Sequence, residues 1–290
     1  MRACRVCGDD GPQHVYHSEP LTSEVLRCRS CGHTYAAKDI LEEFLIADYN
    51  DAEAMQTWAD TVRQESAVRL YRKVTYRLTT LVDTDDVPTV HDVGAGSGGF
   101  LKVARELGWR IQGNEISRPF AEMARQDGVD LYLGALGEEQ RSSSVDAVTL
   151  FCVLAHVQNS GELVREAHRV LAPGGIIFVR TPAWCAIERL GQFLLRISRG
   201  RWSSIMDHRM NLAHLQIFTE RSITKQLESA GFTLEQLETV CEYACPAEVY
   251  LRSFGIPALA RRLAGRALDA LIDRRLFLRN TIHVYARKVA

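Results

Sequence analysis

Two groups of residues in this sequence have types and spacings suited to chemistry. The first is a pair of Cys-x-x-Cys-Gly motifs separated by twenty residues. Four thiolates presented from two tight turns predict a closed, tetrahedral zinc site with a structural role. The predicted ligands are Cys4, Cys7, Cys28 and Cys31. Free or redox-active cysteines are the alternative, and His14, His17 or His33 could replace one of the ligands.

The second group is a glycine-rich turn. Residues 89–101 pass from an apolar run to a carboxylate, Asp92, then to four glycines within six residues, and then to a helical pattern. Glycines allow backbone conformations that side chains block, and they let a ligand approach the N–H groups of the following helix. Glu115 ends the next predicted strand, where a carboxylate could bind a ribose diol. By itself this pattern suits both NAD and S-adenosylmethionine (SAM).

The alternation of strands and helices predicts the scaffold that positions these motifs. Apolar runs typical of strands lie at 89–93, 109–116, 130–136, 145–153 and 176–180, with helical patterns at 100–108, 118–128 and 160–171. This order indicates a doubly wound parallel sheet with helices on both faces. Downstream we expect an irregular segment over 181–218, helices at 219–231 and 246–275, and strands at 232–244 and 280–288.

Composition and charge bound the class of protein. The 290 residues are 46% hydrophobic, and 35 basic residues nearly balance 36 acidic ones, so no overall field favours nucleic acid. No apolar run is long enough to span a bilayer, and the N-terminus lacks the apolar core of a signal peptide. We therefore expect a cytoplasmic protein, in which clustered cysteines favour metal over disulfides.

The succession of motifs resembles the class I SAM-dependent methyltransferases over residues 87–290. The resemblance rests on the glycine turn, on Gly-Asn-Glu at 113–115, on segments 145–157 and 169–175, and on landmarks at 214–219 and 230–232. A subset of that family, from bacterial sugar and secondary-metabolite pathways, begins with a similar paired Cys-x-x-Cys unit. The resemblance implies an α/β fold with a mostly parallel, seven-stranded Rossmann-like sheet, and SAM rather than NAD as cofactor.

By that resemblance, the chain would have three regions and a defined cofactor pocket. Residues 1–40 would form a zinc ribbon, 41–86 a helical connector or lid, and 87–290 the SAM-binding domain, with an acceptor-side insertion at about 183–217. The turn would approach the methionine part of SAM, Asp92 would orient the turn or its ligand, and Glu115 would bind the ribose. The expected pocket comprises Asp92, Gly94, Ala95, Gly96, Gly98, Glu115, Ile116, Leu136 and Phe151.

The sequence departs from its relatives at two places. An acidic residue after the third strand, which often meets the adenine amino group, is replaced by Ala135-Leu136, so backbone and apolar contacts are expected to hold the adenine. The Leu-Glu-His common after the fourth strand is here Leu-Ala-His, with Ala155 in the middle. Because that glutamate contributes to the metal site of metal-dependent members, its loss disfavours metal-assisted catalysis.

A general base is expected among the histidines. His156 is the first candidate, since it follows the strand whose end would face the methyl group and an imidazole titrates near neutrality. Its alternative role is to cap the strand and pack. His208 and His214, in the segment before Phe218, are the other candidates for the base.

Three functional classes are consistent with the sequence. The first is a methyltransferase that acts on a small molecule, such as a sugar or a secondary-metabolite intermediate. The second acts on RNA or protein, with the ribbon as recruiting module, although nucleic acid is disfavoured by the neutral charge. Residues 251–290, with nine basic and two acidic residues, could still form a basic patch. The third is a SAM-binding protein without activity. The oligomeric state is not predicted.

Overall fold

The central feature of the computed structural model is a seven-stranded sheet with the order β10-β11-β8-β7-β4-β5-β6. The structure describes residues 3–38, 51, 65–137, 139–211, 214–243, 247–252, 257–274 and 276–289. The parallel strands are β4 (Thr89–Val93), β5 (Arg110–Glu115), β6 (Tyr132–Leu133), β7 (Val145–Phe151) and β8 (Leu171–Pro182). β10 (Phe232–Val240) and β11 (Thr281–Lys288) complete the sheet with antiparallel pairing. The predicted fold class is confirmed.

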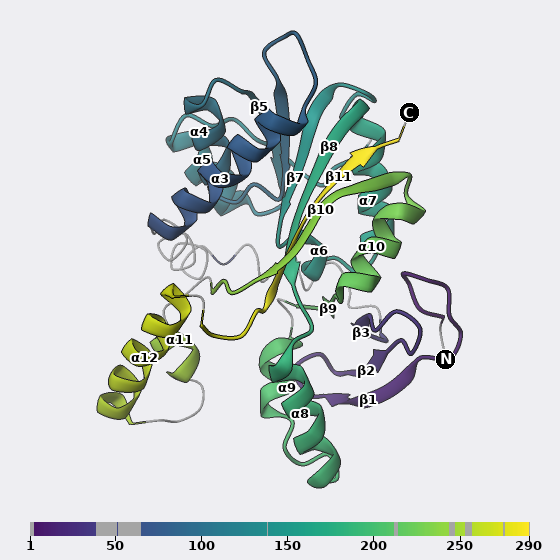
Figure 1. Cartoon of the computed structure of the whole chain (residues 1–290), viewed down its shortest axis with the longest axis vertical. Coiled ribbons are helices and arrows are strands. Elements are labelled where there is room, and N and C mark those ends of the chain that lie inside the picture. Colours follow the sequence, from purple (N-terminus) through teal and green to yellow (C-terminus); the bar gives the residue numbers. More distant parts are fainter. Residues whose placement is uncertain are drawn as a thin grey trace.

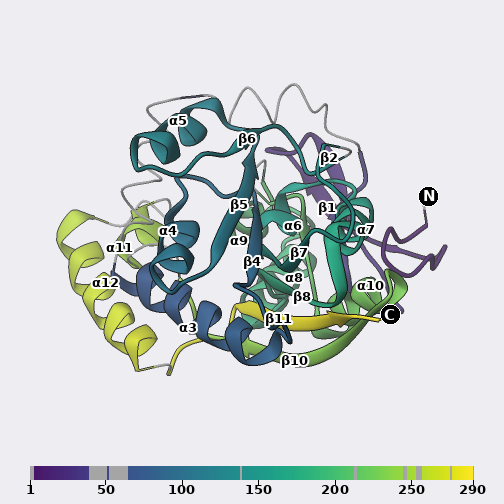
Figure 2. The same cartoon turned by 90° about the horizontal axis from the view of Figure 1, so that it is seen from above.

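Helices cover both faces of this sheet, as Figure 2 shows. α3 (Glu65–Leu81), α4 (Gly99–Glu106) and α5 (Arg118–Gln126) lie on one face, and α7 (Ser160–Val170) and α10 (Glu220–Ser229) lie on the other. Central strands have continuous apolar runs because both of their faces are buried, and β4 is buried at every residue. The core therefore consists of two apolar layers, one on each side of the sheet.

A second, four-stranded sheet lies beyond the carboxyl ends of the parallel strands (Figure 1). The ribbon contributes β1 (Gln13–Ser18), β2 (Ser23–Arg27) and β3 (Thr34–Ala36), and the larger domain contributes β9 (Gln216–Ile217). Because β3 pairs with β9, the ribbon and the larger domain share one sheet.

Several boundaries differ from the sequence-based expectation. The strand expected over 130–136 has only two residues, and the run 145–153 ends as a strand at Phe151, followed by the short helix α6 (Val153–His156). The segment expected to be irregular contains α8 (Ala186–Ile197) and α9 (Ser204–Arg209). The helix expected over 246–275 is divided into α11 (Ala247–Arg252) and α12 (Ala258–Asp273). Of the expected connector helices, α3 lies within the described residues, whereas 41–50 and 52–64 lie outside them.

Candidate functional site

The glycine turn lies between β4 and α4 and adopts the geometry that its sequence requires. Gly94, Gly96 and Gly98 have φ values of 62°, 55° and 75°, in the left-handed region that disfavours other residues. A Cβ atom at Gly96 would meet no atom within 4 Å, so the turn is open above this residue. The turn thus leaves room for a ligand to lie against the backbone at Gly96.

Glu115, at the end of β5, is hydrogen-bonded to this turn. Its Oε2 accepts from the backbone N–H of Gly96 at 2.8 Å, and its Oε1 accepts from that of Ser117 at 2.8 Å. Burial raises the pKa of Glu115, and the backbone N–H donors oppose that rise. Each carboxylate oxygen can accept a further bond, so a ribose diol would find two acceptors here.

Asp92 lies just before the turn and is buried inside the sheet. Its Oδ1 accepts a hydrogen bond of 2.6 Å from the hydroxyl of Thr149 on β7. Burial raises the pKa of Asp92 to about 8, although the Thr149 bond opposes this. The side chain therefore links two central strands and, with no ligand bound, holds a proton at neutral pH.

The short helix α6 packs directly on the glycine turn. A Cβ at Gly94 would lie 2.9 Å from Cγ2 of Val153, so only glycine leaves room for this contact. α6 begins after Cys152, whose φ of 69° is strained for a residue with a side chain. His156 follows Val153 by three residues, about one helical turn. The first candidate base thus belongs to the helix that touches the cofactor turn.

His156 and His214 come together although 57 residues separate them in the sequence. Their ring centroids are 5.4 Å apart, and the thiol of Cys152 joins them in a group whose ligand atoms all lie within 4.8 Å of one another. Burial, and then the nearby charges of His156, Arg209 and Arg180, lower the pKa of His214 to about 3. His214 is therefore neutral at physiological pH.

Two ion pairs surround this histidine pair. Nε of Arg180, on β8, lies 3.0 Å from Oε2 of Glu242, which also bonds to Nε2 of His283 at 2.9 Å. Burial alone would raise the pKa of Glu242, but the His283 bond and the Arg180 charge lower it to about 2. Arg209 pairs with the fully buried Glu188. The histidine pair thus has polar surroundings in which these charges are paired.

The remaining predicted site residues have diverse positions. His208 lies on the exposed face of α9, where its Nδ1 bonds to the carbonyl of Ser204 at 2.9 Å, so the structure does not bring it to the pair. Ile116 is 40% exposed beside Glu115 and offers an apolar surface. Leu136 packs in the core, Phe151 stacks with aromatic neighbours, and Ala95 donates its N–H to the carbonyl of Asn114.

Three residues near the site were not predicted. Tyr71 on α3 packs edge-on against Phe151, with ring centroids 5.2 Å apart, and burial raises its pKa to about 12. Cys152 and Arg180 meet at the ends of β7 and β8, where the N–H of Cys152 donates to the carbonyl of Arg180. A polar side chain at the carboxyl end of an apolar run was the available signal for both, whereas Tyr71 was indistinguishable from core residues of its helix.

The four predicted metal ligands form one cluster. Sγ of Cys4 lies 3.7 Å from Sγ of Cys31, and Sγ of Cys7 lies 3.5 Å from Sγ of Cys28. A tetrahedron with zinc–sulfur bonds of about 2.3 Å has edges of about 3.8 Å, so these sulfur positions fit a zinc ion. His14 and His17 instead bond to Glu24, and the buried ring of His33 stacks against Tyr35 and Phe218.

A chain of hydrogen bonds joins the ribbon to α6. Nε2 of His33 lies 2.9 Å from Oε1 of Gln216, and the amide nitrogen of Gln216 donates to the carbonyls of Leu154 and Val157 at 2.7 and 2.5 Å. The N–H of Leu215 donates to the carbonyl of Ala155. Three carbonyls of the α6 segment are therefore held by β9 and the residue before it.

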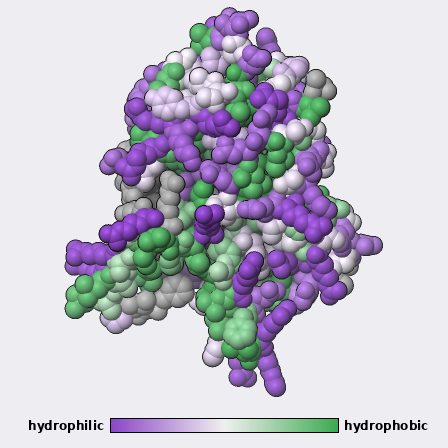
Figure 3. All heavy atoms as spheres, in the orientation of Figure 1, coloured by the Kyte–Doolittle hydropathy of each residue, from purple (hydrophilic) through white to green (hydrophobic). Residues whose placement is uncertain are grey.

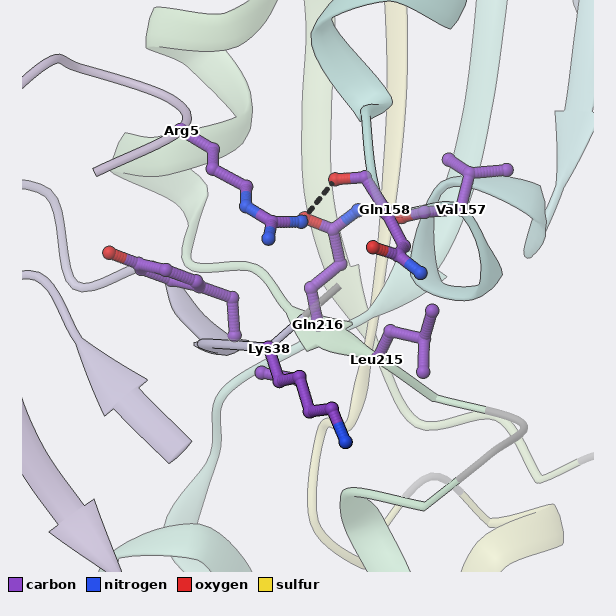
Figure 4. A pocket seen from close by; sticks show the side chains of 8 residues that line it. Arg5, Lys38, Val157, Gln158, Leu215 and Gln216 are labelled. Atoms are coloured by element: carbon purple, nitrogen blue, oxygen red, sulfur yellow. Dashed lines mark hydrogen bonds between the residues drawn. The ribbon is translucent and has the colours of Figure 1, made fainter. Parts of the chain in front are cut away.

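A polar hollow lies at this junction, separate from the glycine turn (Figure 4). It is a small hollow between the ribbon and the residues that follow α6. The guanidinium of Arg5 crosses it and donates to the carbonyl of Gln158 at 2.9 Å. Its lining residues are Arg5, Tyr35, Ala36, Lys38, Val157, Gln158, Leu215 and Gln216.

Comparison with known proteins identifies relatives of this arrangement. A family model described as a methyltransferase domain matches residues 56–237. A probable SAM-dependent methyltransferase of Mycolicibacterium smegmatis is 29% identical over 188 residues, which are 64% of this chain and 63% of that protein. A ubiquinone biosynthesis O-methyltransferase of Xanthomonas oryzae is 29% identical over 121 residues, 37% of this chain and 51% of that protein. The chain thus spans between half and two thirds of these curated relatives.

Solved structures share the same architecture. One is a chain of the complex between the Haloferax volcanii Trm112 methyltransferase activator and a methyltransferase, with a TM-score of 0.57 at 15% identity. The match covers 87% of this chain and 100% of that one. At this identity the likeness concerns the fold alone.

Proposed function

Since the chain belongs to the methyltransferase domain family, we propose that it transfers a methyl group from SAM to a small-molecule acceptor. The single observation that carries the proposal is the contact between the glycine turn and α6, where Val153 packs on Gly94 and His156 follows one turn later. Cofactor-binding and proton-accepting groups thereby become neighbours. The relative named for ubiquinone biosynthesis supports a small molecule as acceptor.

The chain's own groups would hold SAM in a defined way. Open space above Gly96 suits the methionine part, the buried carboxylate of Glu115 suits the ribose diol, and the half-exposed Ile116 suits the flat adenine. When bound, SAM supplies a methyl group on a cationic sulfur. That positive charge would lower the pKa of the buried Asp92 carboxyl and so favour its ionised form.

His156 would remove the proton that the acceptor loses. The neutral imidazole of His214 lies beside His156 and would serve as its hydrogen-bonding partner. Positioning and proton removal are the two tasks that such an enzyme must accomplish at the acceptor. The polar pairs Arg180–Glu242 and Arg209–Glu188 would fix the surroundings of the histidines.

The Cys152–His156–His214 group also has the spacing of a metal site. A thiol and two imidazoles are ligands that zinc accepts. The positive charges of Arg180 and Arg209, which contribute to the low pKa of His214, oppose a dication at this position. We therefore assign the group to proton transfer, which agrees with the absence of the metal-binding glutamate at Ala155.

The test measures SAM binding and methyl transfer separately. Calorimetry gives the SAM affinity, and radiolabelled SAM with a panel of phenols and nucleotide-linked sugars reports transfer. His156→Gln should lower turnover about tenfold or more while SAM affinity stays unchanged. His208→Gln is the matched comparison, because this histidine lies on the exposed face of α9. A greater loss of turnover in His208→Gln than in His156→Gln would assign the base to His208 on α9. Failure of the protein to bind SAM would refute the proposed function.

A further inference from the structure

The helix α8 exposes a stripe of large apolar side chains beyond the carboxyl edge of the sheet. Leu190, Phe193 and Ile197 recur at helical spacing on one face, and Trp202 follows after the helix ends. Each of these four side chains is more than half exposed. Large contiguous apolar surfaces are uncommon on monomeric proteins and mark interaction sites.

Arginines border this stripe. Residues 186–202 contain Arg189, Arg196, Arg199 and Arg201, all exposed, and a single acidic residue, Glu188. Glu188 is fully buried and pairs with Arg209, so segment 186–202 offers no exposed acidic residue to its four exposed guanidinium groups. The whole chain has a net charge of −1, so positive charge is concentrated at this place.

The helix α12 (Ala258–Asp273) also exposes leucines and arginines together. On α12, Leu259 and Leu263 lie four residues apart and are 74% and 61% exposed, and Arg262 and Arg266 are exposed beside them. α12 packs on α11, where Gly265 allows close approach to Glu248. Figure 1 shows α12 and α8 projecting at the same end of the molecule, and Figure 3 shows apolar residues gathered on both projections.

We propose that the exposed face of α8, assisted by α12, binds the surface of an anionic lipid bilayer. A helix with apolar side chains on one face and arginines beside them lies in the membrane interface, where the apolar groups enter the acyl boundary and the cations meet lipid phosphates. Tryptophan favours the same interface. Among the described residues no helix could cross a bilayer, so the contact is peripheral.

The arginines and the apolar stripe together favour an anionic bilayer over RNA as the binding partner. RNA would meet the arginines but would leave Phe193, Ile197 and Trp202 in water, whereas an anionic bilayer satisfies both features. The surface also lies on the acceptor side of the protein, since α9 follows α8 and carries Arg209, whose charge acts on His214. The proposal does not depend on the identity of the acceptor.

The experiment is vesicle flotation with the full-length protein. Vesicles that contain phosphatidylglycerol should carry the protein, pure phosphatidylcholine vesicles should carry much less, and salt should weaken the binding. Phe193→Gln with Ile197→Gln should reduce binding about tenfold or more, because both apolar groups no longer enter the lipid. Arg189→Gln with Arg196→Gln should reduce it about fivefold per arginine.

A matched control is available on another helix. Tyr76 on α3 is 57% exposed, the same fraction as Phe193, and Tyr76→Gln should leave flotation unchanged. SAM calorimetry on each variant verifies folding independently of membrane binding. Absence of flotation by the wild type, or equal flotation of the Phe193/Ile197 and Tyr76 variants, would overturn the proposal. Two other results, each without flotation, would also overturn it. One is RNA binding that persists in the Phe193/Ile197 variant, and the other is self-association that this variant abolishes.

Discussion

The proposed cofactor side and the proposed acceptor side of this site are built in opposite ways. The cofactor side consists of residues 92–98 and Glu115, contributed by two successive strand ends and joined by a 2.8 Å bond between Gly96 and Glu115. The acceptor side joins residues from positions 152 to 214, with Arg180 and Glu242 around them. One side is a local motif, and the other exists only through long-range packing.

This difference teaches which substitutions should separate the two functions. The cofactor side depends on the sheet itself, whose strands are buried on both faces. The acceptor side also depends on the ribbon, through His33, Gln216 and the carbonyls of α6. Disturbance of the ribbon should therefore affect α6 and leave the glycine turn largely intact.

Loss of the cysteine cluster should have the largest effect. Cys28→Ser removes one of the four predicted zinc ligands, and because structural zinc supplies on the order of 10 kcal/mol to small domains, the ribbon should lose its hydrogen-exchange protection. SAM affinity should change by less than about threefold, since the turn lies in the sheet. Mass spectrometry of zinc content and exchange verifies this, with Cys241→Ser as control. Equal loss of SAM binding would erase the distinction between the sides.

Glu115→Ala should affect the cofactor side alone. The variant loses the acceptor of the Gly96 and Ser117 N–H groups and the proposed ribose contact, so SAM affinity should fall about 100-fold or more. Exchange at α6 should stay near the wild-type level. Calorimetry measures the affinity, and Glu122→Ala, an exposed carboxylate on α5, is the control. Unchanged affinity would remove Glu115 from the site.

Gln216→Leu should affect the acceptor side alone. It leaves the carbonyls of Leu154 and Val157 without their donor, so exchange in peptides covering 152–158 and 214–218 should accelerate about tenfold. Gln226→Leu is the matched control, because Gln226 is also a buried glutamine bonded to Ser160. Equal acceleration in both variants would show that general destabilisation is responsible.

Asp92→Asn should have the smallest effect, visible as a change in pH dependence. Burial raises the pKa of Asp92 from an ordinary value of 3.8 to about 8 in the folded protein, so the proton on Asp92 stabilises the fold below pH 4 and that contribution is lost as pH rises through 8. The free energy of unfolding without ligand should therefore fall with pH more steeply in the wild type than in the variant. Denaturation at mildly acidic and mildly alkaline pH measures this; parallel profiles would contradict it.

The sequence predicted the fold and the conformation of the glycine turn because both depend on local patterns. Apolar runs identify strands buried on both faces, and glycines at 94, 96 and 98 occupy left-handed conformations that only their residue type favours. The cysteine pairs predicted one cluster for the same reason, since each pair lies in one turn.

The acceptor side was predictable only in part. His156 and His214 were both candidates, but their proximity depends on β9, a two-residue strand that pairs with the ribbon. The helical segment α8 was expected to be irregular, although its apolar residues recur at helical spacing. The third parallel strand is shorter than expected. The apolar and polar residues of this segment give little information about where strand pairing ends.

The pairing of β9 with β3 of the ribbon ties the ribbon to the rest of the chain. A shortened protein that starts at residue 65 would leave the edge of Gln216 and Ile217 open, with Thr34 and Tyr35 gone from their register. An open strand edge invites pairing with other chains. The ribbon therefore also protects this strand edge from aggregation. Its removal would lower the solubility of the protein before any change in activity could be measured.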